Sequence, residues 1–166
     1  MGLFKKNKQD SKFNLDKVLK MGDETSIIIA IDDYLNEKSD YCEDIKKLNK
    51  SQQTFIIIEN LEREINNGGF NQFYFNSSGD FSQETVDALI EIGANKTADI
   101  VKKANSQFPD NEVPKDRDKR QDILEQIEDK ADEIWETCDN DFYKYEDNIA
   151  GQLIEFVKAN KTDFER

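Results

Sequence analysis

The amino-acid sequence predicts an all-α fold, a compact orthogonal bundle of about seven to eight helices. Three observations support this prediction. Apolar residues recur at the three- and four-residue spacing of a helix along nearly every segment after residue 20, no stretch of useful length alternates as a strand does, and no internal repeat is present. A chain of 166 residues fits one domain, and it is long enough to bury a core without metal or disulfide staples.

The N-terminal segment differs from the rest of the chain in its charge. Residues 1–20 hold six lysines and two aspartates and sum to +4, whereas the whole chain carries −13, which leaves −17 on residues 21–166. We therefore expect a basic, loosely ordered tail at residues 1–20, followed by a single acidic all-helical domain at residues 21–166.

The sequence predicts three helices in the first half of the domain. An apolar stripe over residues 27–35 marks the first helix, and a shorter stripe over residues 41–48 marks the second. The third helix covers residues 51–66 and is apolar nearly all round for a turn, so we expect it to be the central, most buried helix. It ends at Gly68-Gly69, because glycine adopts left-handed backbone freely.

The second half predicts a short aromatic helix over residues 70–75 and then two helices separated by a break at Gly93. An exposed loop follows at residues 109–118, where both prolines lie. The last two helices are expected at residues 118–139 and 146–160. Every regular element predicted for this half of the domain is therefore a helix.

The absence of histidine restricts the chemistry open to this chain. Without histidine there is neither the commonest general base nor the commonest metal ligand, which excludes Ser-His-Asp, Cys-His and histidine-zinc sites. The two cysteines, Cys42 and Cys138, match no zinc or redox spacing. We therefore expect no metal, no cofactor and no enzymatic activity, with a carboxylate- or metal-dependent enzyme kept as one alternative.

The sequence also bears on compartment and on nucleic acid. No window reaches the roughly 18 apolar residues of a membrane helix, and no apolar stretch follows the N-terminal lysines as in a secretory signal. These features predict a cytoplasmic protein without membrane contact. Direct binding of nucleic acid is not expected, because a domain charge of −17 repels phosphates.

The acidic residues concentrate on one predicted helix. The segment from Gln121 to Asp147 holds eleven acidic and two basic residues, a net charge of −9. At about 100° per residue, six carboxylates share one sector beside the sector of the apolar residues. This acidic stripe consists of Asp122, Glu125, Asp129, Asp132, Glu133 and Glu136, and Asp139 and Asp141 are expected to extend it.

The spacing within the acidic stripe suggests a basic partner. Carboxylates at i and i+4 rise about 6 Å along the helix axis, which is close to the phosphate-to-phosphate step along one DNA strand. Like charges at this spacing destabilise an isolated helix by a few tenths of a kcal/mol per pair, and only Lys130 intervenes. Binding to a basic protein, with a DNA-binding protein as the leading candidate, would offset that cost. The alternative is a solvated face that keeps an acidic protein in solution.

A second motif, N-N-G-G-F-N-Q-F-Y-F-N-S-S-G at residues 66–79, carries a family resemblance. Together with A-L-I-E-I-G-A at 88–94, Phe108-Pro109 and R-D-K-R at 117–120, it resembles the bacterial DNA-mimic protein family named for a Neisseria member, otherwise a family of domains of unknown function. The resemblance covers residues 50–160. The signature residues are Asn67, Gly68, Gly69, Phe70, Gln72, Phe73, Asn76, Ser77 and Gly79.

The resemblance implies an all-helical, commonly self-associating protein with no known catalytic activity, so a homodimer is one expectation. In the named member, an acidic surface stands in for duplex DNA and occupies a DNA-binding protein. The signature itself has a structural explanation, because the double glycine turns the chain, the aromatics fill the core and Asn76 with its serines caps the turn. We therefore expect the signature to fix the fold and not to carry the function.

Our leading hypothesis is thus a non-catalytic acidic binding protein that mimics DNA. Two alternatives stay open. An immunity- or antitoxin-type protein that neutralises a basic toxin would use the same electrostatics, and a helical assembly module would use exposed aromatics instead.

Overall fold

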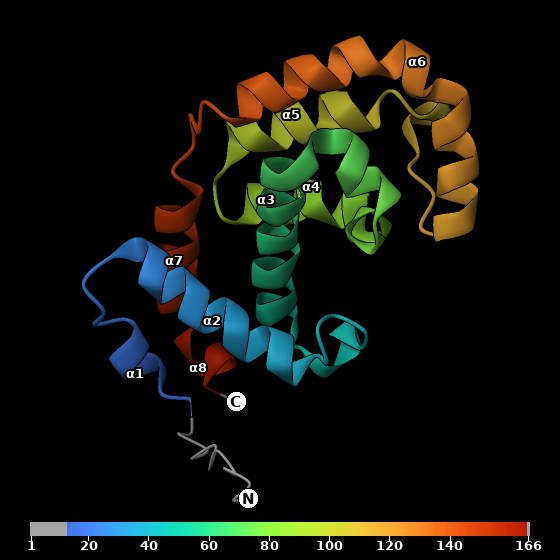
Figure 1. The fold of residues 1–166 in the computed structure, drawn as a ribbon. Coiled ribbons are helices and arrows are strands. Elements are labelled where there is room, and N and C mark those ends of the chain that lie inside the picture. The colour runs from blue at the N-terminus through green and yellow to red at the C-terminus, as the bar shows by residue number, and fades with distance from the viewer. Residues whose placement is uncertain (1–12, 166) are drawn as a thin grey trace, which may run out of the picture.

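The computed structural model describes residues 13–165, and this part of the chain is all-α, as predicted (Figure 1). Its α-helices are α1 Leu15–Val18, α2 Glu24–Lys38, α3 Lys50–Phe75, α4 Ser82–Glu91, α5 Asn95–Asn105, α6 Arg117–Phe142, α7 Ile149–Ala159 and α8 Lys161–Phe164. Three short 3-10 helices join them: η1 Ile45–Lys47, η2 Ser77–Phe81 and η3 Pro109–Asn111. Between residues 13 and 165 no strand forms, and no helix is long and apolar enough to cross a membrane.

Helix α3 is the central element of the bundle, as predicted for residues 51–66. It packs against α2, α4, α6 and α8, and Figure 1 shows it running through the middle of the molecule. The fully buried apolar side chains before the double glycine are Phe55, Ile56, Ile58, Leu61 and Ile65. A capping box begins the helix, because the side chains of Asn49 and Gln52 each accept a hydrogen bond from the other's backbone N–H.

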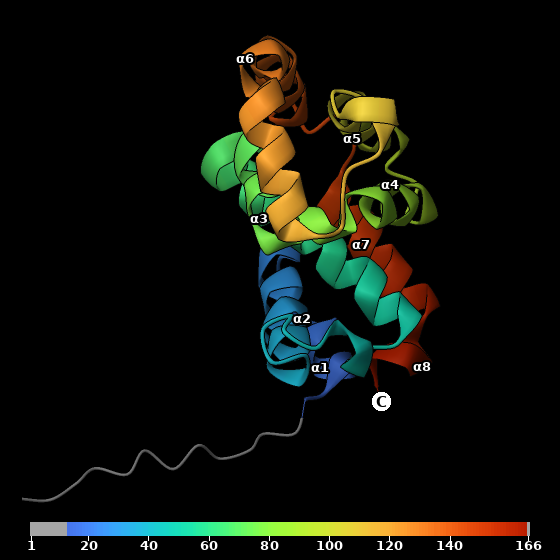
Figure 2. The same cartoon turned by 90° about the vertical axis from the view of Figure 1, so that its right-hand side faces the viewer.

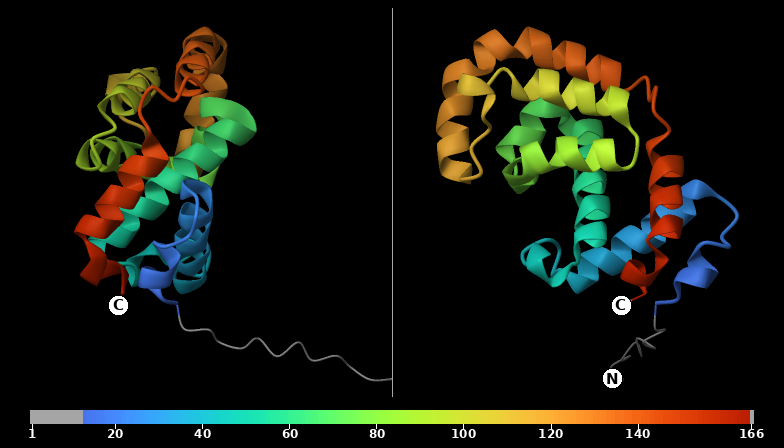
Figure 3. Two further views of the ribbon diagram at one scale, coloured as in Figure 1. Left: turned by 90° about the vertical axis from the view of Figure 1, so that its left-hand side faces the viewer. Right: turned by 180° about the vertical axis from the view of Figure 1, so that it is seen from behind.

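The remaining helices gather around the two ends of α3. At one end, α2 packs against α1 and α7, and α8 against α7 (Figure 3). At the other end, α4 packs on α5 and α5 on α6, so that α5 lies between α4 and α6 (Figure 2). Helix α6 arches over α5 and the second half of α3, which leaves its convex side facing outwards (Figure 1).

The first described residues correct the expected tail boundary. Residues 13–20 contain α1, whose Leu15 and Val18 are buried. Asp16 of this helix pairs with Lys161 of α8 at 2.7 Å. Apolar contacts and this ion pair thus attach residues 13–20 to the bundle. The rest of the predicted tail lies outside the described residues.

The helix predicted over residues 41–48 is wrong. Its first part is a left-handed turn, in which Asp40, Tyr41 and Cys42 have φ of 51°, 57° and 68°. The hydroxyl of Ser39 accepts a hydrogen bond from the N–H of Cys42 at 3.2 Å and so offers the backbone an alternative to continued helix. Tyr41 is 75% exposed as a result, and only the short η1 remains of the expected stripe.

Candidate functional site

The candidate site is the outer face of α6, and a buried arginine positions the start of this helix. Arg120 has a fully buried side chain. Its Nε donates to the carbonyl of Tyr74 at 2.6 Å, and its Nη1 to that of Pro114 at 2.7 Å. Its Nη2 donates to the carbonyl of Asn76 at 2.9 Å and to Oδ1 of Asp80 at 2.6 Å. These bonds fasten α6 to the end of α3 and to η2.

Two signature glycines allow α6 to approach α3 closely. Gly69 has a left-handed φ of 74°, and a Cβ there would lie 2.2 Å from Oδ2 of Asp139. A Cβ on Gly79 would lie 2.7 Å from Nε of Arg120. Oδ1 of Asp139 accepts a hydrogen bond from the N–H of Phe70 at 2.9 Å, just after the turn. The double glycine therefore bends the chain as predicted, and α3 resumes beyond it.

Three polar side chains of the motif at residues 66–79 converge on Glu64, one turn before the double glycine. Its Oε2 accepts hydrogen bonds from the side-chain amides of Gln72 and Asn76, both at 2.8 Å. Its Oε1 accepts one from the hydroxyl of Ser78 at 3.1 Å. The signature thus fixes its own turn through Glu64, which sequence reasoning had not connected with it.

The signature aromatics form the core beneath α6. Phe70, Phe73 and Tyr74 are fully buried. Trp135 of α6 packs on Tyr74 with ring centroids 5.3 Å apart. Phe75 is the exception to the expected core, because it is 51% exposed. The middle of α6 therefore rests on a packed aromatic base.

The acidic stripe lies on the solvent side of α6. All six of its carboxylates are exposed, whereas Leu124, Ala131, Trp135 and Cys138 are buried on the opposite side of the helix. Within the described part of the chain, no ion pair and no hydrogen bond engages any of these six carboxylates. Among residues 13–165 the stripe is therefore a row of like charges without a compensating cation.

The two carboxylates expected to extend the acidic stripe are placed differently. Asp139 is half-buried against Gly69, and burial raises the pKa of its carboxyl although the hydrogen bond from Phe70 opposes that shift. Asp141 pairs with Lys144 at 2.6 Å, and this hydrogen-bonded partner lowers the pKa of its carboxyl. Both make contacts within the chain, so we leave them out of the surface proposed below.

A cluster of half-buried carboxylates lies between α2 and α3 and was not predicted. Burial, and then the nearby carboxylates of Glu62 and Asp32, raise the pKa of Glu59 to about 8. Asp32 receives a hydrogen bond from Arg63 at 2.7 Å, yet burial still raises the pKa of its carboxyl. One oxygen each of Asp32 and Glu59 is buried without a partner. The only sequence signal was the placement of Glu59 on a helix that is apolar nearly all round.

Neither cysteine belongs to a recognisable reactive site. Both cysteines are free, and Cys138 is fully buried, which raises the pKa of its thiol to about 11. Cys42 is half-buried beside the left-handed turn. Among residues 13–165, no three histidine, cysteine, aspartate or glutamate side chains are arranged to hold a metal ion.

Fold and surface together define an acidic, helical protein whose described residues leave one row of carboxylates on a firmly held helix without a partner. Comparison with protein families makes the assignment more specific. The family described as DMP19-like protein matches residues 46–160, and the chain belongs to this family. The matched region includes the whole signature and the acidic stripe, so the resemblance to a DNA-mimic family is confirmed. No curated protein and no solved structure matches the chain.

Proposed function

We propose that this protein is a non-catalytic DNA mimic, whose acidic stripe occupies the DNA-binding surface of a basic protein in place of duplex DNA. The observation that carries the proposal is the row of six exposed carboxylates without a partner among the described residues. Membership of the DMP19-like family supports the same reading.

The electrostatics of the acidic stripe favour such a partner. Neighbouring carboxylates on one helix face repel one another, and a basic surface relieves that repulsion when it binds. A row of like charges also attracts a basic partner over a distance and raises the association rate, an effect that salt screens. Binding through this surface is therefore expected to weaken steeply as salt concentration rises.

The stripe is also held in place before any partner arrives. Arg120 fixes the start of α6, and Trp135 anchors its middle in the core. Near its end, the hydroxyl of Tyr143 donates to the carbonyl of Ile65 at 2.8 Å. Because α6 needs no ordering on association, little conformational entropy is lost when its carboxylates bind.

The test begins with a pull-down from a bacterial lysate on the immobilised protein, eluted with duplex DNA and in parallel with salt. We expect a DNA-binding protein that both treatments release. That protein is then purified and titrated against the wild-type chain and against the variant Glu125→Gln, Asp129→Asn, Asp132→Asn and Glu136→Gln. The variant is expected to bind at least about tenfold more weakly, with a smaller salt dependence.

A matched control removes the same amount of charge elsewhere. The variant Asp33→Asn, Glu43→Gln, Asp110→Asn and Glu112→Gln alters four exposed carboxylates outside the stripe. It is expected to stay within about threefold of the wild-type affinity. Equal affinities of the stripe variant and the wild type would contradict the proposed function. A retained protein that duplex DNA does not displace would point to the immunity-type alternative.

A further inference from the structure

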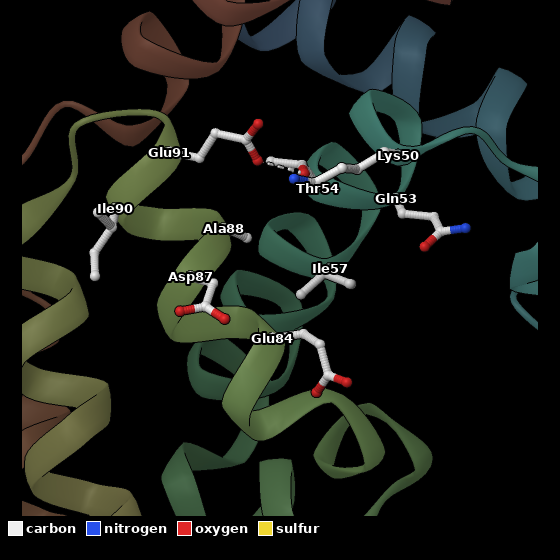
Figure 4. A pocket seen from close by; sticks show the side chains of 9 residues that line it. All are labelled: Lys50, Gln53, Thr54, Ile57, Glu84, Asp87, Ala88, Ile90 and Glu91. Carbon is white, nitrogen blue, oxygen red and sulfur yellow. Dashed lines mark hydrogen bonds between the residues drawn. The ribbon is translucent and has the colours of Figure 1, made fainter.

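A groove between α3 and α4 is the second acidic surface of the molecule, and α5 separates α4 from the helix that bears the stripe (Figure 2). The groove encloses about 430 Å³. Thr54 and Ile57 of α3 and Ala88 of α4 lie at its base, where each is 5–7% exposed (Figure 4). An apolar base of this kind is suited to the side chains of a bound segment.

A second hollow of about 560 Å³ lies between α4 and α7, and Glu91 lines both hollows. The second hollow is lined on its apolar side by Ile92 and Phe156 and on its acidic side by Glu24 and Glu155. Both hollows therefore have apolar as well as acidic side chains in their lining.

The walls of this surface are strongly negative. The lining carboxylates are Glu24, Glu84, Asp87, Glu91 and Glu155, and the only cation that lines either hollow in the described chain is Lys50. Lys115 and Lys158 pair with Glu84 and Glu155 from outside the hollows. Asp87, Glu91 and Glu24 have no cationic partner among the described residues.

Three of the side chains that line the groove between α3 and α4 are Glu84, Ile90 and Glu91. Glu91 accepts a hydrogen bond from the hydroxyl of Thr54 at 2.9 Å, which Figure 4 shows across the groove. One oxygen of Glu84 is bound to Lys115, whereas its other oxygen is buried without a partner. Ile90 lines the rim and is 45% exposed. Carboxylates that can bind cations and side chains with apolar surface therefore line the same groove.

We propose that this groove binds a cationic amphipathic peptide segment of a partner protein, in which lysine or arginine side chains flank apolar side chains at helical spacing. Charge complementarity selects the cations, because an anionic ligand would face Glu24, Asp87 and Glu91, which have no cationic partner among the described residues. The apolar base selects the amphipathic pattern, because an oligolysine would leave it in contact with water. This site is independent of the acidic stripe and of the function proposed for it.

The test uses a fluorescein-labelled lysine–leucine peptide of about 18 residues, or about five helical turns, with its leucines on one helix face. A second probe has the same composition with the leucines spread around the helix. Anisotropy titrations use the full-length protein at about 0.15 M salt, where long-range attraction between exposed charges is screened. We expect the amphipathic probe to bind at least about tenfold more tightly than the scrambled one.

Variants locate the binding site. Ile90→Ser combined with Asp87→Asn and Glu91→Gln is expected to weaken binding of the amphipathic probe by about tenfold. A control, Ile29→Ser with Asp33→Asn, removes one exposed isoleucine and one carboxylate, against one isoleucine and two carboxylates in the groove variant. Ile29 is 54% exposed, Asp33 is exposed, and both lie on α2 and line neither hollow. The control is expected to change affinity by less than about threefold, as is the four-residue stripe variant.

Three results would overturn the proposal. Equal affinity for the two probes would show that only charge is read, and loss of binding in the stripe variant alone would place the peptide on α6. Tighter binding of a peptide copied from residues 1–12 than of the amphipathic probe would assign the groove to the chain's own N-terminal segment. Circular dichroism of each variant checks that the fold is kept, so that lost binding is attributable to the groove.

Discussion

The signature segment and the acidic stripe lie on opposite sides of α6. Charge is paired within the chain on the first side and lacks a partner among the described residues on the second. On the inner side, Arg120 is fully buried, and Asp80 and backbone carbonyls accept its hydrogen bonds. On the outer side, six carboxylates have no partner among the described residues. A charge satisfied within the chain stabilises the fold, whereas a charge left unsatisfied on a rigid surface is available to another molecule.

The largest expected effect comes from breaking the satisfied side. Arg120→Met keeps much of the side-chain volume but leaves Asp80 and the carbonyls of Tyr74, Asn76 and Pro114 without their donor. Polar groups that lose the hydrogen bonds of a buried charge are strongly destabilising. We therefore expect the free energy of unfolding to fall by about 3–5 kcal/mol. Urea denaturation followed by the fluorescence of buried Trp135 measures this change.

Arg117 supplies the matched control for that experiment. It lies three residues earlier on α6, is exposed, and donates one long hydrogen bond, of 3.3 Å, to the carbonyl of Phe75. Arg117→Met is expected to cost less than about 1 kcal/mol. If both arginine variants lost the same stability, the contrast between the two sides of α6 would not hold.

An intermediate effect is expected from Glu59, a buried carboxyl whose environment disfavours its charge. Burial and neighbouring carboxylates raise its pKa in the folded state to about 8, above its ordinary value of 4.5. The stability that comes from the protonated carboxyl is therefore complete below about pH 4.5 and is lost as pH rises to about 8. Glu59→Gln cannot ionise, so it should remove this loss.

We therefore compare the change in the free energy of unfolding that Glu59→Gln causes at pH 8.5 and at pH 4.5. We expect this change to be more favourable at pH 8.5 by on the order of 2 kcal/mol. Urea titrations at the two pH values measure the difference. The control is Glu128→Gln, which removes a carboxylate from an exposed position on α6. A pH-independent effect of Glu59→Gln would mean that Glu59 is ionised in the folded protein at neutral pH.

The sequence was informative where the signal lies within one helix. Apolar spacing located the central helix α3, and the spacing of about 100° per residue placed the acidic stripe in a sector separate from the buried face of α6. It was uninformative where partners lie far apart along the chain. Arg120 belongs to a basic run that is otherwise exposed, and its partners at Tyr74 and Asp80 are about forty residues away. Only the folded chain brings them together.

The same limit applies to Asp139. Helical spacing alone adds Asp139 to the acidic stripe, because the geometry of one isolated helix does not show that the turn at Gly69 lies against that part of α6. Phe75 is the converse case, since an aromatic residue in an aromatic run is expected in the core but is 51% exposed at the end of α3. Periodicity predicts the face of a helix, and tertiary contacts decide which part of that face is covered.

The smallest effect is expected from the acidic stripe itself. The variant Glu125→Gln, Asp129→Asn, Asp132→Asn and Glu136→Gln removes repulsion between carboxylates three and four residues apart. It breaks no side-chain hydrogen bond or ion pair among the described residues. At low salt we expect the free energy of unfolding to rise by about 0.5–1 kcal/mol. The gain should shrink at about 0.5 M salt, because screening already weakens the repulsion in the wild type. A loss of stability would mean that these carboxylates support the fold. A small gain together with weakened partner binding would separate the functional side of α6 from the side that holds it in place.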